Sequence, residues 1–214
     1  MAPPDRQPFS LTYVSYTPGD KVGLLCALLA LAPVFIIVAY ATLFVSRREA
    51  HLIWMLIGQL LNVALNAALK AAIGQPRPPG ADHDGMGMPS DHAQFMGFWA
   101  CYGALFLAIH VPRLGRSGWR SLLILAMCVL ALAVAASRVY LGYHTVAQIS
   151  VGLGVGSAVS FVWFAMYTTW LRPCLGAWVS NSAVCRYLLI RDAAHIDDLL
   201  TFEYDAIMRK VKCP

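Results

Sequence analysis

The chain has 214 residues, of which 59% are hydrophobic and only 13% are charged. An ordinary soluble domain is about one quarter charged, so this composition excludes a typical soluble protein and indicates a chain that lies mostly in a membrane. The net charge of +5 does not indicate a nucleic-acid-binding protein, because the basic residues alternate with apolar segments instead of forming one patch.

Five apolar segments approach or reach the roughly 17 to 25 residues that a helix needs to cross a bilayer. The fourth is short unless Arg120 and Arg138 snorkel at its ends. The sequence therefore predicts an all-α, polytopic membrane helix bundle with about five transmembrane helices. We expect residues 1–171 to form the membrane domain and residues 172–214 an amphipathic tail at the interface. The predicted spans are Val22–Val45, Leu52–Ile73, Ala93–Val111, Ser121–Ala136 and Ile149–Leu171.

The basic residues also predict an orientation. Arg47 and Arg48 follow the first span, further arginines follow the third, and the tail is rich in arginine and lysine. By the positive-inside rule, the tail and the first and third loops are cytoplasmic, and the second and fourth loops face the outside or an organelle lumen. Residues 1–21 lack the pattern of a cleavable signal, so we expect the first span to stay in the mature protein.

Three polar residues recur every fourth position in the second span, namely Asn62, Asn66 and Lys70. This spacing places them on one helix face, and we expect that face to meet other helices because polar groups in hydrocarbon are costly. Two interpretations remain open. The stripe is either a hydrogen-bond ladder between helices with Lys70 snorkelling, or it leads to a site at the lumenal end.

Further polar residues fall on that same lumenal side. Arg77 lies in the second loop, Ser90 is expected to cap the start of the third span, and Arg138 closes the fourth. Together with Lys70, two arginines and the free N–H groups of a helix N-terminus suit a phosphate group.

Two histidines accompany the cations, His92 in the first turn of the third span and His144 shortly after Arg138. A lone histidine at a membrane boundary is usually structural. Two histidines beside three cations favour phosphoryl transfer, in which one imidazole is the nucleophile and the other is the acid for the leaving oxygen.

These residues resemble the type 2 phosphatidic acid phosphatase superfamily, whose signatures are K-x6-R-P, P-S-G-H and S-R-x5-H-x3-D. The matching residues are Lys70 with Arg77-Pro78, then Pro89-Ser90-Asp91-His92, then Ser137-Arg138 with His144. Within that superfamily the chain is similar to eukaryotic dolichyl diphosphate phosphatases along nearly its whole length, in pieces such as "MGMPSDHAQFM" and "SRVYLGYHT".

The resemblance implies hydrolysis of dolichyl diphosphate to dolichyl phosphate on the lumenal face of the endoplasmic reticulum membrane, which recycles the lipid carrier for N-glycosylation. It implies no metal or other cofactor, and it implies that the protein's partners are the polyprenyl diphosphate substrate and membrane lipids. It also implies that His144 forms a phosphohistidine and that His92 protonates the leaving oxygen. The residues that would bind the phosphate oxygens are Lys70, Arg77, Ser90 and Arg138.

Two positions depart from the superfamily pattern. Asp91 replaces the glycine of P-S-G-H, where it is either a plain first-turn acid or a partner of the cations or of His92. Gln148 replaces the aspartate that orients the nucleophile, so an amide oxygen would receive the ring N–H of His144 without a full negative charge. Asp82 and Asp84 are alternative acids, although loop solvation explains them better.

Other functions stay open at this stage. One is a phosphatase for phosphatidate or undecaprenyl diphosphate, and another is a lipid carrier or channel without catalysis, whose path the cations would line. The last five residues, Lys210 to Pro214, resemble the K-x-K-x-x retrieval signal of endoplasmic reticulum membrane proteins and agree with a cytoplasmic tail.

Overall fold

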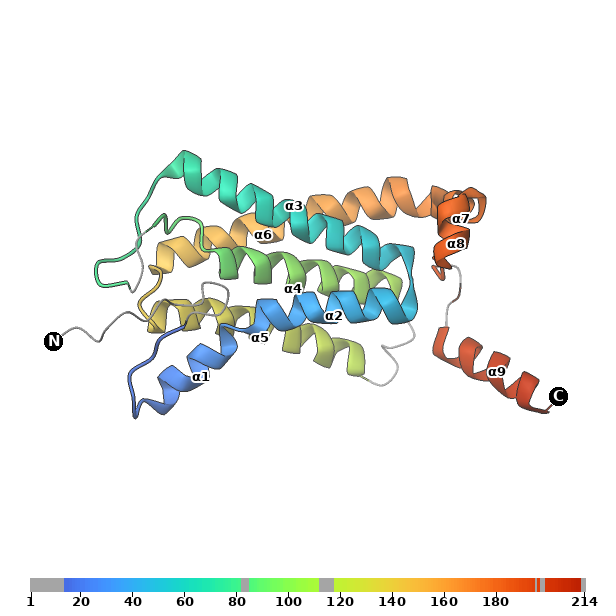
Figure 1. Ribbon diagram of the computed structural model, residues 1–214, viewed down its shortest axis with the longest axis horizontal. Coiled ribbons are helices and arrows are strands. Elements are labelled where there is room, and N and C mark those ends of the chain that lie inside the picture. Colours follow the sequence, from blue (N-terminus) through green and yellow to red (C-terminus); the bar gives the residue numbers. More distant parts are fainter. Residues whose placement is uncertain (1–13, 82–84, 112–117, 195, 197–198, 213–214) are drawn as a thin grey trace.

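The structure is a computed structural model that describes residues 14–81, 85–111, 118–194, 196 and 199–212 (Figure 1). Over this part of the chain, every regular element is helical, and five helical segments are long and apolar enough to cross a membrane. The predicted all-α, five-span architecture is therefore confirmed. The elements are α1 (Lys21–Leu29), α2 (Ala32–Arg47), α3 (Ala50–Ile73), α4 (Asp91–His110), α5 (Trp119–Tyr140), α6 (Val146–Met166), η2 (Tyr167–Leu171), α7 (Arg172–Asn181), α8 (Ala183–Leu188) and α9 (Leu199–Lys212).

The first and last spans are each built from more than one helix. The first is broken between α1 and α2, and Figure 1 shows the change of direction at this point. The last continues through η2 and α7 to Asn181, beyond the expected end at Leu171. Pro173 would normally interrupt such a helix. Here the wide π turn of η2 precedes it, and Pro173 occupies the first turn of α7, where its missing N–H is tolerated.

α4 lies at the centre of the bundle and packs closely against α6. Gly152 and Gly156 make this approach possible, because a Cβ on Gly152 would lie 2.8 Å from the Ser90 carbonyl oxygen and one on Gly156 would lie 2.9 Å from the Phe98 nitrogen. Ser160 continues the same stripe and is fully buried. Small residues of this kind let two helices in a membrane approach each other closely.

A hydrogen-bond ladder joins α3 to α4 along the predicted polar stripe. Asn62 donates to the Gln94 carbonyl oxygen at 3.2 Å, and Asn66 donates to the Gln94 side-chain oxygen at 2.8 Å. The Gln94 amide in turn donates to the Asn62 side chain at 2.9 Å. All three side chains are almost completely buried, so the ladder satisfies polar groups that would otherwise be costly in hydrocarbon.

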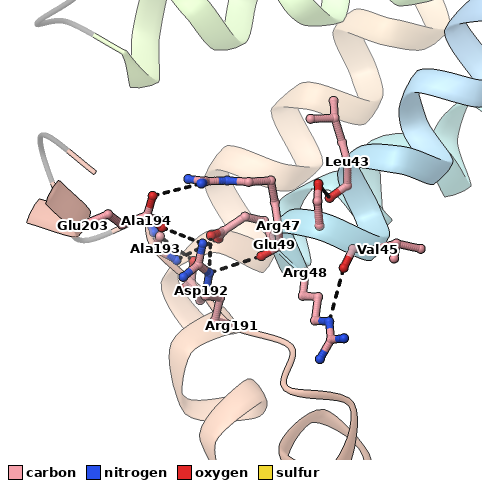
Figure 2. A network of polar contacts seen from close by, with 11 residues as sticks. Leu43, Val45, Arg47, Arg48, Glu49, Arg191, Asp192, Ala193, Ala194 and Glu203 are labelled. Atoms are coloured by element: carbon pink, nitrogen blue, oxygen red, sulfur yellow. Dashed lines mark hydrogen bonds and ion pairs between the residues drawn. The ribbon is translucent and has the colours of Figure 1, made fainter. Parts of the chain in front are cut away.

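The two ends of the bundle differ in chemistry. The C-termini of α3 and α5 and the N-termini of α4 and α6 meet at one end, whereas the tail helices lie at the other (Figure 1). At the tail end, Arg191 pairs with Glu49 at 2.8 Å and with Glu203 at 2.7 Å, and Glu203 also pairs with Arg47 at 2.9 Å (Figure 2). This network ties α9 to the turn between α2 and α3.

Candidate active site

The nucleophile candidate His144 is positioned by the turn that joins α5 to α6. The backbone N–H groups of Tyr143 and His144 both donate to the Arg138 carbonyl oxygen, at 3.0 and 3.1 Å. Gly142 takes the left-handed backbone region, at φ 75°, which glycine adopts without strain. The turn therefore folds His144 back beside Arg138, and the His144 side chain is only 2% exposed.

A capping box fixes the start of α6 directly after His144. Thr145 accepts a hydrogen bond from the Gln148 backbone N–H, and the Gln148 side-chain oxygen accepts one from the Thr145 N–H, both at 3.2 Å. The amide nitrogen of Gln148 donates to the Pro76 carbonyl oxygen at 2.9 Å. Gln148 is thereby held in one orientation, with its oxygen toward His144.

The hydrogen bonds of His144 define which ring nitrogen carries the proton. Arg77 can only donate, so the Nε2 atom of His144, 3.2 Å from the Arg77 guanidinium, must accept. The other nitrogen, Nδ1, lies 3.2 Å from the Gln148 side-chain oxygen and donates to it. A neutral imidazole in this state presents the Nε2 lone pair to the cation.

The surroundings of His144 also favour the neutral ring. Burial lowers the pKa of His144 to about 4, and the positive charges of Arg77, Arg138 and Lys70 act in the same direction. The hydrogen bond to Gln148 opposes this change and raises the pKa. The effect of all three cations on one ring shows that the structure brings the predicted basic residues together.

Arg138 lies in the last turn of α5 and does not snorkel, because its side chain is 4% exposed. Its guanidinium carbon stacks 4.2 Å above the Tyr143 ring. Within the described part of the chain, its Nε and Nη1 atoms have no hydrogen-bond partner. Buried guanidinium N–H groups are costly to leave unpaired, so these two donors point to an anionic ligand.

Ser90 occupies the N-cap position of α4, but its side chain makes no capping hydrogen bond, in contrast to the prediction. Its hydroxyl is fully buried and has no partner among the described residues. The Ser90 backbone N–H donates to the Gln148 carbonyl oxygen at 3.2 Å, which joins the N-termini of α4 and α6. The free hydroxyl is thus another unsatisfied group on the same side of the bundle.

Lys70 completes the cationic cluster from the last turn of α3. Its ammonium group forms an ion pair with Asp91, whose side chain is 52% exposed. Asp91 is therefore the partner of a cation, which is one of its predicted alternatives, and not a plain first-turn acid. Lys70 is held in this ion pair and does not simply snorkel to the interface.

His92 is also in the first turn of α4, but its contact leads away from the cations. Its Nε2 atom lies 2.9 Å from the backbone carbonyl oxygen of Ala30, at the break between α1 and α2. The charges of Arg138, Asp91 and His144 nevertheless act on the His92 ring, so His92 borders the same site.

Four positioning groups were not predicted from the sequence, namely Thr145, Tyr143 and the carbonyl groups of Pro76 and Ala30. Only the first has a local signal, because "TVAQ" fits the capping-box pattern. Asp82 and Asp84 lie outside the described residues, as do Cys213 and Pro214. Over the part of the chain that is described, no cluster of three or more His, Cys, Asp or Glu side chains could hold a metal ion.

The five-span bundle and its cluster of cations and histidines define a phosphatase embedded in the membrane. Comparison with known proteins agrees: the model of the PAP2 superfamily matches residues 51–172. The chain belongs to this superfamily, as its three motifs predicted, and it is a hydrolase.

Curated relatives cover nearly the whole chain. Dolichyldiphosphatase 1 from Homo sapiens is 39% identical over 94% of this chain and 88% of the relative, and Dolichyldiphosphatase 1 from Dictyostelium discoideum is 35% identical over 94% and 90%. Lipid phosphate phosphatase gamma from Arabidopsis thaliana is 36% identical over 96% and 92%. The fold is also that of a crystal structure of a transmembrane PAP2-type phosphatidylglycerolphosphate phosphatase from Bacillus subtilis, with a TM-score of 0.62, 22% identity and coverage of 75% of this chain and 83% of that one.

Proposed function

We propose that this protein hydrolyses dolichyl diphosphate to dolichyl phosphate and phosphate, through a phosphohistidine on His144 and without a metal. The observation that carries the proposal is the pair of hydrogen bonds on His144. Gln148 keeps the proton on Nδ1, so the lone pair of the ring is on Nε2, and it attacks the phosphorus atom once Arg77 donates to the phosphate oxygens instead of to Nε2.

The unsatisfied donors support a binding site for the terminal phosphate. Arg138 contributes the free Nε and Nη1 groups, and Ser90 contributes its hydroxyl. Arg77 contributes its guanidinium beside the nucleophile. Phosphoryl transfer is accelerated mainly by positioning and by charge stabilisation at the equatorial oxygens, which these cations supply.

Gln148 supports a diphosphate over a phosphate monoester as substrate. A neutral amide stabilises the imidazolium that forms on attack less than a carboxylate does. Such a weakly assisted nucleophile suits a good leaving group. The group that leaves from a lipid diphosphate is a phosphate, which is a much weaker base than the alkoxide that leaves from phosphatidate. The names of the Homo sapiens and Dictyostelium discoideum relatives point to the same substrate.

An apolar pocket beside His92 supports a position for the lipid portion of the substrate. A pocket of about 120 Å³ lies between α2, α3 and α4 and includes the side chains of Pro33, Val63, Phe95 and His92. A long polyprenyl chain that lies in the bilayer would reach the site from this side while its head group meets the cations.

We assign the protein to the endoplasmic reticulum membrane, and the distribution of basic residues supports a cytoplasmic tail and a site on the opposite, lumenal face. In that orientation the reaction would return the lipid carrier to N-glycosylation after the oligosaccharide is transferred.

The test uses purified protein and dolichyl diphosphate labelled in its terminal phosphate, with and without a chelator. We expect phosphate release that the chelator leaves unchanged, and labelled phosphohistidine after an alkaline quench, because phosphohistidine survives alkali. The His144→Gln variant should lose both signals. His110→Gln, which removes a histidine at the opposite end of α4, should keep both. Label on the protein that persists in His144→Gln would contradict the assignment.

A second comparison tests the leaving group. The Gln148→Glu variant replaces the amide by a carboxylate of the same shape. We expect its ratio of phosphatidate to dolichyl diphosphate hydrolysis to rise above that of the unmodified protein. A ratio that stays the same or falls would show that Gln148 does not favour the anhydride.

A further inference from the structure

The break between α1 and α2 leaves a backbone acceptor facing the site. In an uninterrupted helix the Ala30 carbonyl would accept from the Val34 N–H. Here Val34 donates instead to the Leu31 carbonyl oxygen at 3.0 Å, and Phe35 donates to the same oxygen at 3.2 Å. The Ala30 carbonyl is therefore released from the helical pattern and meets His92 at 2.9 Å.

Pro33 explains why the break occurs at this point. Proline lacks the N–H that would donate to the Leu29 carbonyl, and its ring clashes with that carbonyl in a continuous helix. Pro33 accordingly stands in the first turn of α2, just after the break. The same residue lines the pocket that contains His92, so the break, the pocket and His92 form one local unit.

The contact determines the tautomer of His92. A carbonyl oxygen can only accept, so Nε2 of His92 carries the proton and donates it to Ala30. In the neutral ring Nδ1 then has the lone pair, and in the protonated ring Nδ1 carries the second proton.

We propose that the Ala30 carbonyl, released by the break at Pro33, is a positioning group that fixes His92 so that Nδ1 exchanges protons with the substrate. This proposal rests on the proposed function, in which His92 is the acid. A backbone carbonyl would take the place of the carboxylate that commonly orients a catalytic histidine.

The proton can be followed through both steps. As the His144 nitrogen bonds to phosphorus, the bridging P–O bond breaks and its electron pair stays on the leaving oxygen, which receives the proton from His92 Nδ1. His92 is then neutral and still donates through Nε2 to Ala30. In the second step the water oxygen bonds to phosphorus, the bond from phosphorus to His144 Nε2 breaks, and its electron pair returns to that nitrogen. His92 Nδ1 takes a proton from the attacking water, so both rings return to their starting state and phosphate is released.

The tautomer can be measured without turnover. We expect ¹⁵N spectra of histidine-labelled protein, recorded at a pH at which the ring is neutral and with the His92 signals assigned by their loss in His92→Gln, to show His92 protonated at Nε2. In Pro33→Ala the helix can continue and the Val34 N–H can reclaim the Ala30 carbonyl, so this preference should be lost. Pro173→Ala removes a first-turn proline from α7 and is the matched control. An Nδ1–H tautomer in the unmodified protein, or an unchanged tautomer in Pro33→Ala, would overturn the assignment.

A kinetic measurement separates positioning from general damage. Protonation of the leaving group matters most when that group is a strong base. Pro33→Ala should therefore lose more activity with phosphatidate, which releases an alkoxide, than with an aryl phosphate, which releases a weakly basic phenolate. Equal losses on both substrates, with the Nε2–H tautomer seen in the unmodified protein, would mean that Ala30 orients His92 but that His92 is not the acid. Normal activity in His92→Gln would instead remove the proposed function from this residue altogether.

Discussion

The acid side of the pH profile tests the state of His144. In the proposed mechanism the neutral ring is the nucleophile, so the free enzyme should lose activity as pH falls through the pKa of His144. Because that pKa is lowered to about 4, kcat/KM should be retained well below pH 6.5, where an ordinary histidine titrates. Replacing Arg77 by glutamine removes the nearest cation and should move the loss of activity to higher pH.

The expected size of the effect follows from the same pKa. A change from 6.5 to about 4 corresponds to about 3 kcal/mol of preference for the neutral ring. At pH 6 a histidine with an ordinary pKa is roughly three quarters protonated, whereas His144 would be almost entirely neutral. Burial is the largest cause, so we expect Arg77→Gln to recover only part of the difference.

The assay is kcat/KM for dolichyl diphosphate between about pH 4 and pH 8. The substrate phosphate ionises near pH 6 and contributes equally for every variant, so the displacement between variants carries the result. Arg48→Gln, an exposed arginine near the opposite end of the bundle, is the control and should keep the original profile. If activity is lost at the same acidic pH in the unmodified protein and in Arg77→Gln, the proposed effect of Arg77 on the pKa of His144 is refuted.

Four other variants, of which Gly154→Ala is a control, test the packing and the cations. Asp91→Asn frees Lys70 from an exposed ion pair that is worth at most about 1 kcal/mol. The KM for dolichyl diphosphate should therefore fall by up to about fivefold while kcat is kept. A higher KM would contradict the idea that Asp91 competes with the substrate for Lys70. Gly156→Ala forces a Cβ into the α4 backbone and should lower the thermal midpoint in detergent, by an overpacking cost of about 1–3 kcal/mol. Gly154→Ala, where the Cβ meets open space, should leave the midpoint nearly unchanged, and equal shifts would refute the packing argument. Gln94→Leu removes the side-chain partner of Asn62 Oδ1 and of Asn66 Nδ2 and should cost about 2–4 kcal/mol in the same assay. An unchanged midpoint would show that these side-chain bonds are dispensable.

The sequence predicted the architecture well because the membrane imposes simple rules. Apolar length identified the five spans, and the four-residue spacing of Asn62 and Asn66 identified the face of α3 that meets α4. Such features depend on local periodicity and on the cost of polar groups in hydrocarbon, and both are readable in one sequence.

The fine structure of the site was less predictable, because it depends on backbone groups from distant segments. No residue type signals that the Pro76 carbonyl holds Gln148 or that the Ala30 carbonyl meets His92. The motif pattern suggested that Ser90 would cap α4, yet its hydroxyl stays free while the Gln148 carbonyl takes the Ser90 N–H. These contacts exist only after the helices pack.

The packing of α4 on α6 therefore connects fold and chemistry. Gly152 lets α6 approach the Ser90 carbonyl, and this approach allows the Ser90 N–H to bond to Gln148 one turn earlier on α6. Gln148 in turn orients His144. A side chain that separated these two helices would move His144, the proposed nucleophile, away from the Ser90 hydroxyl, the proposed phosphate ligand, even though neither residue had changed. Residues with no polar atom in their side chains are thus as necessary for the geometry of the reaction as the histidines, because productive attack tolerates little misplacement of the reacting atoms.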